Sequence, residues 1–363
     1  MKILLIGEYS NVHWTLAEAF RSLGHEVTVV SSGDGWKDYR RDIDIQFSSR
    51  LALIGFLYTS FIKGLFKGYD VVQVINYRFL FGETNEWLNK YLFDYLKKNN
   101  RRIFLGAYGD DYFWVKSCVD GKYRYSPFDA LTYQEDPYAK SVLRLLQPTS
   151  RKLNTYIAER SDGIISCMYE YYRAYQDDYY DRLAYIALPV NTGEIQYIPN
   201  KIAENGVVKL FVGVQRSRSL WKGTDIIINE LNAFKDKYND LVDIQVVTNV
   251  SYHEYLRLYD ECNIFFDQVY SYSQGMNALT AMAKGKILFG GAEPESYELI
   301  GEKENFPIFN MLHHKKNLFS TLEQLLKRKD EFEAMGQKSR RYIEENHHYI
   351  KVAQQYITVY EKF

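Results

Sequence analysis

Short apolar runs alternate with amphipathic segments through the first half of the chain. Apolar residues recur at helical spacing over 12–23 and 86–98, which predicts two helices that each bury one face. Polar turns bound the apolar runs, and we predict strands at 2–6, 26–31, 70–75, 102–107 and 162–167. Because strands and helices alternate, this half is predicted to be an α/β unit with a mainly parallel sheet.

The second half repeats this alternation. Predicted strands lie at 207–212, 242–247, 263–267 and 287–290, with helices at 226–234, 253–259 and from 275 onward. Further helices are predicted in the tail at 318–326, 332–342 and 349–360. Proline and glycine at 189–193 interrupt the pattern and predict a linker. A chain of 363 residues is long enough for two domains, each with its own core.

Charge and composition exclude several classes of protein. The 45 basic and 46 acidic side chains give a net charge of −1, so no overall field attracts nucleic acid or an anionic membrane. Cys118, Cys167 and Cys262 are far apart and form no zinc motif, so we expect reduced thiols. The first apolar run is too short for a signal peptide, and no run reaches about 18 residues. We therefore predict a cytoplasmic protein without a membrane span.

The stretch 211–225 carries the most specific chemistry. A buried strand ends at Gly213, and a loop with Arg216 and Arg218 leads into a helix near Lys222. Loops at the carboxyl ends of parallel strands open into the crevice where doubly wound sheets bind ligands. Because the arginine fork and the lysine charge suit phosphate oxygens, we predict that these cations bind a diphosphate. The alternative is a solvated basic loop.

A second phosphate-binding group is predicted at the start of a later helix. This helix begins near Gly275 and Met276, after a strand that ends at Asp267. Free amides and the helix dipole attract anions at such an end, so it would complement the arginine loop. Asp267 lies at a strand end and is a candidate contact for a sugar.

The first half offers candidate catalytic groups after its first strand. Gly7, Glu8 and Tyr9 are predicted to line the crevice, and His13 lies where this loop enters a helix. We predict that His13 contacts a donor or acceptor hydroxyl group. The alternative is a surface or packing residue.

Two adjacent carboxylates follow the strand at 102–107. Asp110 and Asp111 are candidates for a general base or for binding sugar hydroxyl groups. The alternative is a turn or a helix cap built from Asp110.

Several of these stretches resemble one enzyme family. The basic loop at 211–223, the sequence Ala281–Lys286 and the turn Gly290–Ser296 are similar to the donor domain of GT-B-fold glycosyltransferases of the retaining family-4 type. Residues 23–27 look like the first unit of the same enzymes, and the resemblance covers essentially the whole chain.

The fold implied by this resemblance is α/β with two domains. Two Rossmann-like, doubly wound domains would face each other across a cleft, an acceptor domain at 1–190 and a donor domain at 191–345. A final helix at 346–363 would cross back to the first domain.

The resemblance also implies a reaction. A nucleotide-diphospho-sugar would give its sugar, with retention, to a saccharide or lipid-linked acceptor in bacterial cell-surface polysaccharide or glycolipid biosynthesis. We expect no cofactor, no nucleic acid and no metal, since Asp110–Asp111 lacks the Asp-x-Asp spacing that holds a metal in glycosyltransferases of the other common fold. A sugar-nucleotide epimerase or hydrolase and a non-catalytic sugar-nucleotide-binding protein remain alternatives.

The family has two glutamates, separated by seven residues, that contact the donor sugar and the ribose. Their positions hold Tyr272 and Thr280 here. The donor sugar and nucleoside are therefore predicted to meet the polar side chains nearby, namely Asp267, Gln274, Asn277, Thr280, Glu293 and Glu295. Glu293 or Glu295 is the candidate for the ribose diol, and the alternative is a helix-capping carboxylate.

Two segments have open roles. The run 51–67 is the most lipophilic of the chain, either an interfacial helix at lipid headgroups or a helix that covers the strand at 70–75, which we favour. An interfacial helix would place the protein at the inner face of the membrane. Residues 115–148 are irregular and rich in aromatic residues, as in an acceptor-binding insertion, and include Tyr123, Tyr125, Tyr133 and Tyr138.

Overall fold

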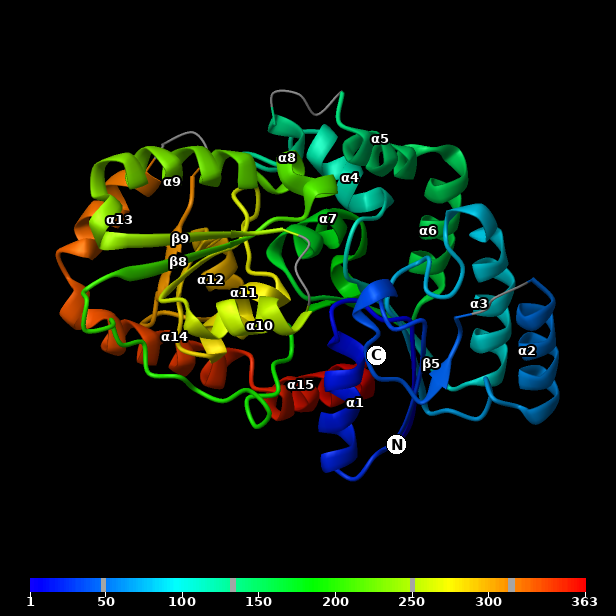
Figure 1. Ribbon diagram of the computed structural model, residues 1–363. Coiled ribbons are helices and arrows are strands. Elements are labelled where there is room, and N and C mark those ends of the chain that lie inside the picture. The colour runs from blue at the N-terminus through cyan, green and yellow to red at the C-terminus, as the bar shows by residue number, and fades with distance from the viewer. Residues whose placement is uncertain (47–49, 131–134, 249–251, 313–316) are drawn as a thin grey trace. The chain divides into compact units, whose positions relative to one another are not determined.

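The structure, a computed structural model, describes residues 1–46, 50–130, 135–248, 252–312 and 317–363. The chain divides into two compact units (Figure 1). Unit 1 comprises Met1–Lys116, Arg144–Pro189 and Tyr349–Phe363, and unit 2 comprises Ser117–Leu143 and Val190–His348. The segment Ser117–Leu143 therefore belongs to unit 2, although the predicted boundaries place it in the N-terminal domain.

Unit 1 is built on a parallel sheet in the order β3-β2-β1-β4-β5-β6-β7. Its strands are β1 (Lys2–Ile6), β2 (Glu26–Ser31), β3 (Ile43–Asp44), β4 (Val71–Val74), β5 (Arg102–Ala107), β6 (Gly163–Ser166) and β7 (Leu183–Tyr185). The central strands are buried along nearly their whole length, because helices cover both faces of such a sheet. The strand order reverses between β1 and β4, and ligands bind doubly wound sheets at such a point.

The helices of unit 1 connect these strands. They are α1 (Val12–Ser22), α2 (Arg50–Lys63), α3 (Trp87–Asn99), α4 (Tyr112–Val119, whose last residues belong to unit 2), α6 (Pro148–Arg160), α7 (Tyr169–Tyr179) and α15 (Tyr349–Lys362). The last helix, α15, packs beside α1, as Figure 1 shows, and the rings of Tyr356 and Tyr360 lie 6.3 and 6.0 Å from that of Phe20. The end of the chain is thus part of unit 1.

Unit 2 contains a smaller parallel sheet in the order β12-β11-β10-β8-β9. Its strands are β8 (Val208–Gly213), β9 (Val242–Val247), β10 (Ile264–Phe266), β11 (Ile287–Gly290) and β12 (Ile308–Asn310). Its helices are α5 (Pro137–Leu143), α8 (Ser219–Lys222), α9 (Thr224–Tyr238), α10 (Tyr252–Glu261), α11 (Met276–Ala283), α12 (Pro294–Ile300), α13 (Leu318–Leu326) and α14 (Phe332–Asn346). Phe234, Phe266, Phe289 and Phe332 lie in its core. Here the strand order reverses between β8 and β10, where the predicted basic loop begins.

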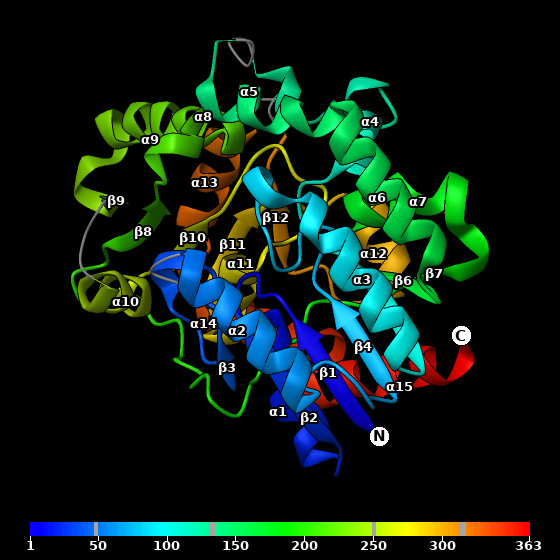
Figure 2. The same ribbon diagram turned by 90° about the vertical axis from the view of Figure 1, so that its right-hand side faces the viewer.

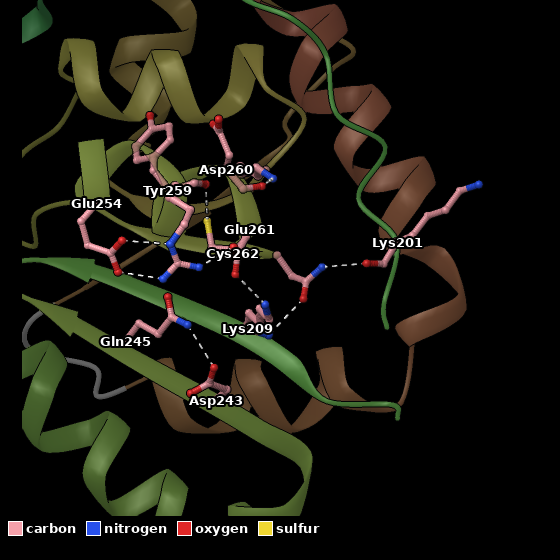
Figure 3. A network of polar contacts seen from close by, with 12 residues as sticks. Lys201, Lys209, Asp243, Gln245, Glu254, Tyr259, Asp260, Glu261 and Cys262 are labelled. Carbon is pink, nitrogen blue, oxygen red and sulfur yellow. Dashed lines mark hydrogen bonds and ion pairs between the residues drawn. The ribbon is translucent and has the colours of Figure 1, made fainter. Parts of the chain in front are cut away.

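A polar network closes the amino edge of the unit 2 sheet (Figure 3). The Lys209 ammonium lies 2.9 Å from the Glu261 carboxylate, which joins the start of β8 to the end of α10. Asn263 accepts a hydrogen bond from the Lys209 amide (3.0 Å) and donates one to the Lys201 carbonyl (3.2 Å). These polar groups satisfy one another, so this edge holds the unit together.

The doubly wound α/β fold predicted for both halves is confirmed, but α2 differs from the interpretation that we favoured. Its most apolar side chains do not cover the sheet, and the exposed fractions of Leu51, Ile54, Tyr58 and Ile62 are 80, 61, 69 and 64%. In the part of the chain that the structure describes, no helix has both the length and the apolar character needed to cross a bilayer.

Candidate active site

The loop after β8 meets the loop after β10 at the reversal of strand order. The β8 loop contains a 3-10 turn at Arg216–Arg218, then α8, and then Gly223, whose φ of +68° lies in the left-handed region. A Cβ atom at Gly223 would lie 2.9 Å from the Val269 Cβ atom. The Val269 amide also donates a 2.9 Å hydrogen bond to the Lys222 carbonyl. Glycine is therefore needed where the two loops touch.

The three predicted cations all lie on this β8 loop. Arg216 is exposed, whereas Arg218 and Lys222 are half-buried. The Arg218 guanidinium stacks over the ring of Tyr138, 4.4 Å from its centroid, in a cation–π contact. The predicted helix entry at Lys222 is confirmed, with the addition of the break at Gly223 between α8 and α9.

Asp267 directly follows β10 and lies at the amino end of α11. Its Oδ2 atom is buried and has no hydrogen-bond partner among the described residues. Burial raises the pKa of Asp267, while the Lys222 charge and the Gly275 amide act in the opposite direction. A Cβ atom at Gly275 would lie 3.9 Å from Oδ2 and one at Gly290 would lie 3.5 Å from the Asp267 Cβ atom. An acceptor oxygen, a cation and helix amides thus converge here.

Three other residues predicted to contact the donor, Gln274, Thr280 and Asn277, make hydrogen bonds within unit 2. Gln274 is buried and its Nε2 donates to the Gly291 carbonyl (2.7 Å). The Thr280 hydroxyl donates to the Met276 carbonyl one turn earlier (2.8 Å). Asn277 is exposed, and its backbone carbonyl accepts from a tyrosine. Their contacts with a nucleoside stay predictions.

Glu293 and Glu295, the candidates for the ribose diol, have partners within unit 2, and their contact with a ribose stays a prediction. The buried carboxylate of Glu293 accepts hydrogen bonds from the Tyr125 hydroxyl (2.8 Å), the Asn310 amide (3.0 Å) and the Arg124 guanidinium. Glu295 accepts from the same guanidinium through both carboxylate oxygens. The two carboxylates hold the Arg124 guanidinium in place through these hydrogen bonds.

Tyr272 occupies the first of the two glutamate positions. Its side chain is buried, and its hydroxyl accepts a 2.7 Å hydrogen bond from the Arg124 amide. Its ring stacks on that of Tyr125, with centroids 4.7 Å apart and planes 22° apart. This position therefore anchors the segment that contains Arg124 and Tyr125. Tyr133, in the same segment, lies outside the described residues.

In unit 1, the loop after β1 is packed rather than open. Gly7 has a φ of +88°, and a Cβ atom there would lie 2.2 Å from the Ile75 Cγ2 atom. Glu8 is buried and accepts from the amides of His13 (3.2 Å) and Trp14 (2.9 Å). Burial raises the pKa of Glu8 to about 8. Glu8 thus caps α1, and this corrects its predicted role at the cleft.

His13 is also a correction, because its side chain is fully buried in the core of unit 1. Its Nδ1 donates to the Gly7 carbonyl (2.8 Å), and its Nε2 accepts from the Gln73 amide (3.1 Å). Burial lowers the pKa of His13 to about 3, so the ring is neutral. With both nitrogens engaged, it has no atom to offer a substrate.

The two adjacent aspartates, Asp110 and Asp111, have different surroundings. Asp111 is buried and accepts from the Trp114 amide (2.9 Å) and the Tyr175 hydroxyl (2.5 Å). It caps α4, which corrects its predicted catalytic role. Asp110 is half-buried beside Tyr9, whose pKa rises to about 12 through burial and the Asp110 charge. Of the unit 1 candidates, Tyr9 and Asp110 are partly open to solvent.

Comparison with a protein-family model assigns the second half of the chain. Residues 218–358 match the family described as "Glycosyl transferase-like". This part of the chain matches a glycosyltransferase-like domain. The predicted enzyme class is confirmed. The match favours sugar transfer over the two alternatives, a sugar-nucleotide epimerase or hydrolase and a non-catalytic sugar-nucleotide-binding protein. A search of curated protein sequences finds no match.

Solved structures confirm the GT-B fold of the glycosyltransferase. HepE from Anabaena, in complex with UDP, aligns over 100% of both chains with a TM-score of 0.61 and 11% identity. Sucrose-phosphate synthase from Thermosynechococcus elongatus aligns over 100% of this chain and 99% of its own (TM-score 0.63, 15% identity). WaaG, a glycosyltransferase involved in lipopolysaccharide biosynthesis, aligns over 98% of both chains (TM-score 0.54, 11% identity). At these identities the likeness is one of fold.

Sequence reasoning missed Arg124 as a residue at the carboxyl edge of the unit 2 sheet. Its partners Glu293 and Glu295 lie about 170 positions further along the chain, so no local pattern links them. The aromatic residues around Arg124 predict an acceptor-binding insertion instead. The sequence signal that could have indicated this contact is the excess of aromatic residues near Arg124 and near Tyr272, since Tyr125 stacks on Tyr272.

Proposed function

We propose that unit 2 binds a nucleotide-diphospho-sugar at the reversal of strand order between β8 and β10. The observation that carries this proposal is the buried Oδ2 of Asp267, which lacks a partner among the described residues beside Lys222 and the amino end of α11. Arg216, Arg218 and Lys222, with the amides at Gly275 and Met276, would bind the diphosphate. HepE has been solved in complex with UDP and with UDP-glucose, which supports this ligand class.

In the proposed reaction, the bond between the anomeric carbon and the diphosphate oxygen breaks and a bond to an acceptor hydroxyl forms. The cations and helix amides stabilise the charge that grows on the departing diphosphate. This phosphate takes the acceptor proton, and the sugar keeps its anomeric configuration. Asp267 accepts a hydrogen bond from a hydroxyl group of the transferred sugar. No metal ion or cofactor takes part in this scheme.

We propose that unit 1 binds the acceptor at the carboxyl edge of its sheet, where Tyr9 and Asp110 are partly exposed. Because the pKa of Tyr9 is about 12, its hydroxyl keeps its proton and donates to an acceptor oxygen. The acceptor class is a saccharide or a lipid-linked saccharide of a bacterial cell-surface polysaccharide or glycolipid. The involvement of WaaG in lipopolysaccharide biosynthesis supports this class.

We further propose that the cytoplasmic enzyme contacts the inner face of the membrane through α2 and α3. These helices lie side by side (Figure 2), and the rings of Phe61 and Tyr95 meet at 4.6 Å. The exposed Trp87 and Tyr91 continue the stripe of Tyr95 along α3 at four-residue spacing. The sequence of α2 contains no carboxylate, and the exposed Lys63 ends it, which suits anionic headgroups.

Sedimentation with vesicles that contain an anionic lipid tests this contact. Replacing Ile54 and Tyr58 by serine removes two exposed apolar groups, so we expect less protein in the vesicle pellet. The matched control is Leu241→Ser, which removes an exposed apolar side chain from unit 2. Equal sedimentation of all three proteins would contradict the proposed membrane contact.

A thermal-shift screen with nucleoside diphosphates and nucleotide sugars tests the donor site. A ligand that binds the folded state raises the melting temperature, and Lys222→Ala should reduce that shift, since a lost charge-assisted hydrogen bond weakens binding about tenfold. Lys237→Ala removes a lysine elsewhere in unit 2, where it pairs with Glu323, and is the control. No shift with any nucleoside diphosphate at millimolar concentration would overturn the proposal.

Turnover with an acceptor panel tests the reaction itself. We expect release of the nucleoside diphosphate to depend on an added saccharide or glycolipid, and the product to keep the anomeric configuration of the donor by NMR. A product of inverted configuration would refute the retaining scheme.

A further inference from the structure

Four residues in the segment Ser117–Leu143 make contacts along the carboxyl edge of the unit 2 sheet, and we call these four residues the latch. They are Arg124, Tyr125, Phe128 and Tyr138. The flanking stretches of sequence belong to unit 1, but the latch residues pack within unit 2. No feature of the family resemblance described above predicts these contacts.

At one end, the latch holds the turn between β11 and α12. The Arg124 guanidinium binds the carboxylates of Glu293 and Glu295, with Nη2 3.1 Å from the Glu295 Oε2 atom. Burial raises the pKa of Glu295, but the hydrogen bonds from Arg124 and from its own amide bring the pKa below its ordinary value. The buried charge of Glu293 also meets the Tyr125 hydroxyl at 2.8 Å. This turn is therefore tied to the latch through two carboxylates.

At the other end, the latch holds the β8 loop. The Trp221 side chain is buried between Phe128 and Tyr138, with edge-on ring contacts at 4.9 and 5.4 Å. Tyr138 also carries the Arg218 guanidinium on its ring face. Figure 2 shows α5, which contains Tyr138, beside α8, which contains Trp221, and α5 contacts the turn at Arg216–Arg218 that leads into α8. Trp221 immediately precedes Lys222, so two of the proposed phosphate-binding cations depend on this packing.

We propose that the latch positions the donor site, with Tyr138 fixing Arg218 against the diphosphate and Arg124 fixing the latch itself. The contacts run from the β11 turn, through Tyr272 after β10, to the β8 loop, and so they join all three loops at this edge. Arginine loses side-chain entropy when it binds an anion, and a ring that holds the guanidinium in place reduces that loss. This inference rests on the diphosphate site proposed above.

A double-mutant cycle between Tyr138 and Arg218 tests the proposal by calorimetry with UDP, GDP, ADP and CDP. We expect Tyr138→Leu to weaken binding of the best diphosphate about fivefold, the size of one cation–π contact, and Tyr138→Phe to bind like the native protein. If Tyr138 acts through Arg218, Tyr138→Leu adds no further loss in the Arg218→Ala background. Additive losses, or unchanged binding by Tyr138→Leu, would overturn the role of Tyr138.

The second variant acts on the more exposed end of the latch. Arg124 has 55% of its side chain exposed, and Arg124→Gln should raise the KM for the sugar nucleotide severalfold while kcat changes less. Arg124→Lys should restore part of the loss. Arg328→Gln, which removes another arginine paired with a glutamate in unit 2, is the control. An Arg124→Gln enzyme with native KM would contradict the latch.

The outcomes separate this inference from the proposed function. If the native protein binds none of the four diphosphates, the donor site itself is wrong. If the native protein binds one and Arg218→Ala weakens that binding, but the latch variants do not, the donor site stands and the latch inference fails.

Discussion

Asp111 and Asp267 each follow the carboxyl end of a parallel strand, Asp111 in the loop after β5 and Asp267 directly after β10, and they have opposite surroundings. Asp111 is saturated, because it accepts from the Trp114 amide and the Tyr175 hydroxyl. Asp267 keeps a buried oxygen without a partner in the described part of the chain, close to the charge of Lys222. A carboxylate at a strand end is thus a candidate for substrate binding only where the fold leaves its acceptor oxygens available.

The same contrast separates the two edges of the unit 2 sheet. At the amino edge, Lys209 pairs with Glu261, and Arg257 pairs with Glu254 and Glu261 (Figure 3). The charges of these side chains therefore neutralise one another. At the carboxyl edge, Arg218 stacks on an aromatic ring, which leaves the donor groups of its guanidinium available to an anion. Ligand chemistry is expected where charge is positioned without being neutralised.

Asp267→Asn should have the largest effect. The amide is a weaker acceptor for a sugar hydroxyl in the transition state, so we expect kcat/KM to fall about 100-fold. Binding of the nucleoside diphosphate alone should be unchanged or tighter, because a negative charge near the phosphates is removed. Steady-state kinetics and calorimetry measure the two quantities. Asp243→Asn, on an exposed part of β9, is the control, and equal loss in both variants would break the contrast.

His13→Ala should reduce stability rather than chemistry. It removes a buried ring together with the hydrogen bonds that this ring makes to the Gly7 carbonyl and to the Gln73 amide, which keeps its bond to the Tyr108 hydroxyl, so we expect the free energy of unfolding to fall by about 2–3 kcal/mol. Urea denaturation measures this change. At a temperature where the variant is folded, kcat should be close to native. A stable variant with a greatly reduced kcat would instead restore His13 as a catalytic residue.

Asp111→Asn should have the smallest effect at acidic pH, and its effect should grow as the pH rises toward 7. Burial raises the pKa of Asp111 to about 7 and that of Glu8 to about 8, so the folded protein binds more protons than the unfolded chain between their ordinary and raised pKa values. Stability is therefore greatest at acidic pH and falls as the pH rises from the ordinary carboxyl pKa values up to about 7 for Asp111 and about 8 for Glu8, by up to about 1.4 kcal/mol per pH unit for each group.

Removing the titrating carboxyl at position 111 should flatten this fall between pH 5 and 7 and leave the Glu8 part above it. Denaturation midpoints at pH 5, 6, 7 and 8 measure both slopes. Parallel slopes for the native protein and Asp111→Asn would show that Asp111 is ionised throughout.

The fold could be predicted because its signals are local. The alternation of apolar runs and amphipathic segments indicates strands and helices within a dozen residues, and Gly213 and Lys222 mark where the β8 loop begins and ends. Asp267 was found for the same reason, since a strand end is visible in the sequence.

Several of the residues that the structure places differently have partners that are distant in the sequence. His13 meets Gln73 60 positions away, Asp111 meets Tyr175 64 positions away, and Glu293 meets Arg124 169 positions away. A histidine or a carboxylate looks equally reactive before its partner is known. Burial and hydrogen bonding, which come from tertiary structure, decide whether it is.

The assignment of Ser117–Leu143 to unit 2 has a consequence for how such enzymes recombine. A chimera joined near residue 190 would combine one parent's second half with the other parent's version of this segment. Arg124 would then meet foreign residues at positions 293 and 295. Exchange of donor preference between related enzymes should therefore succeed only when both stretches are transplanted together.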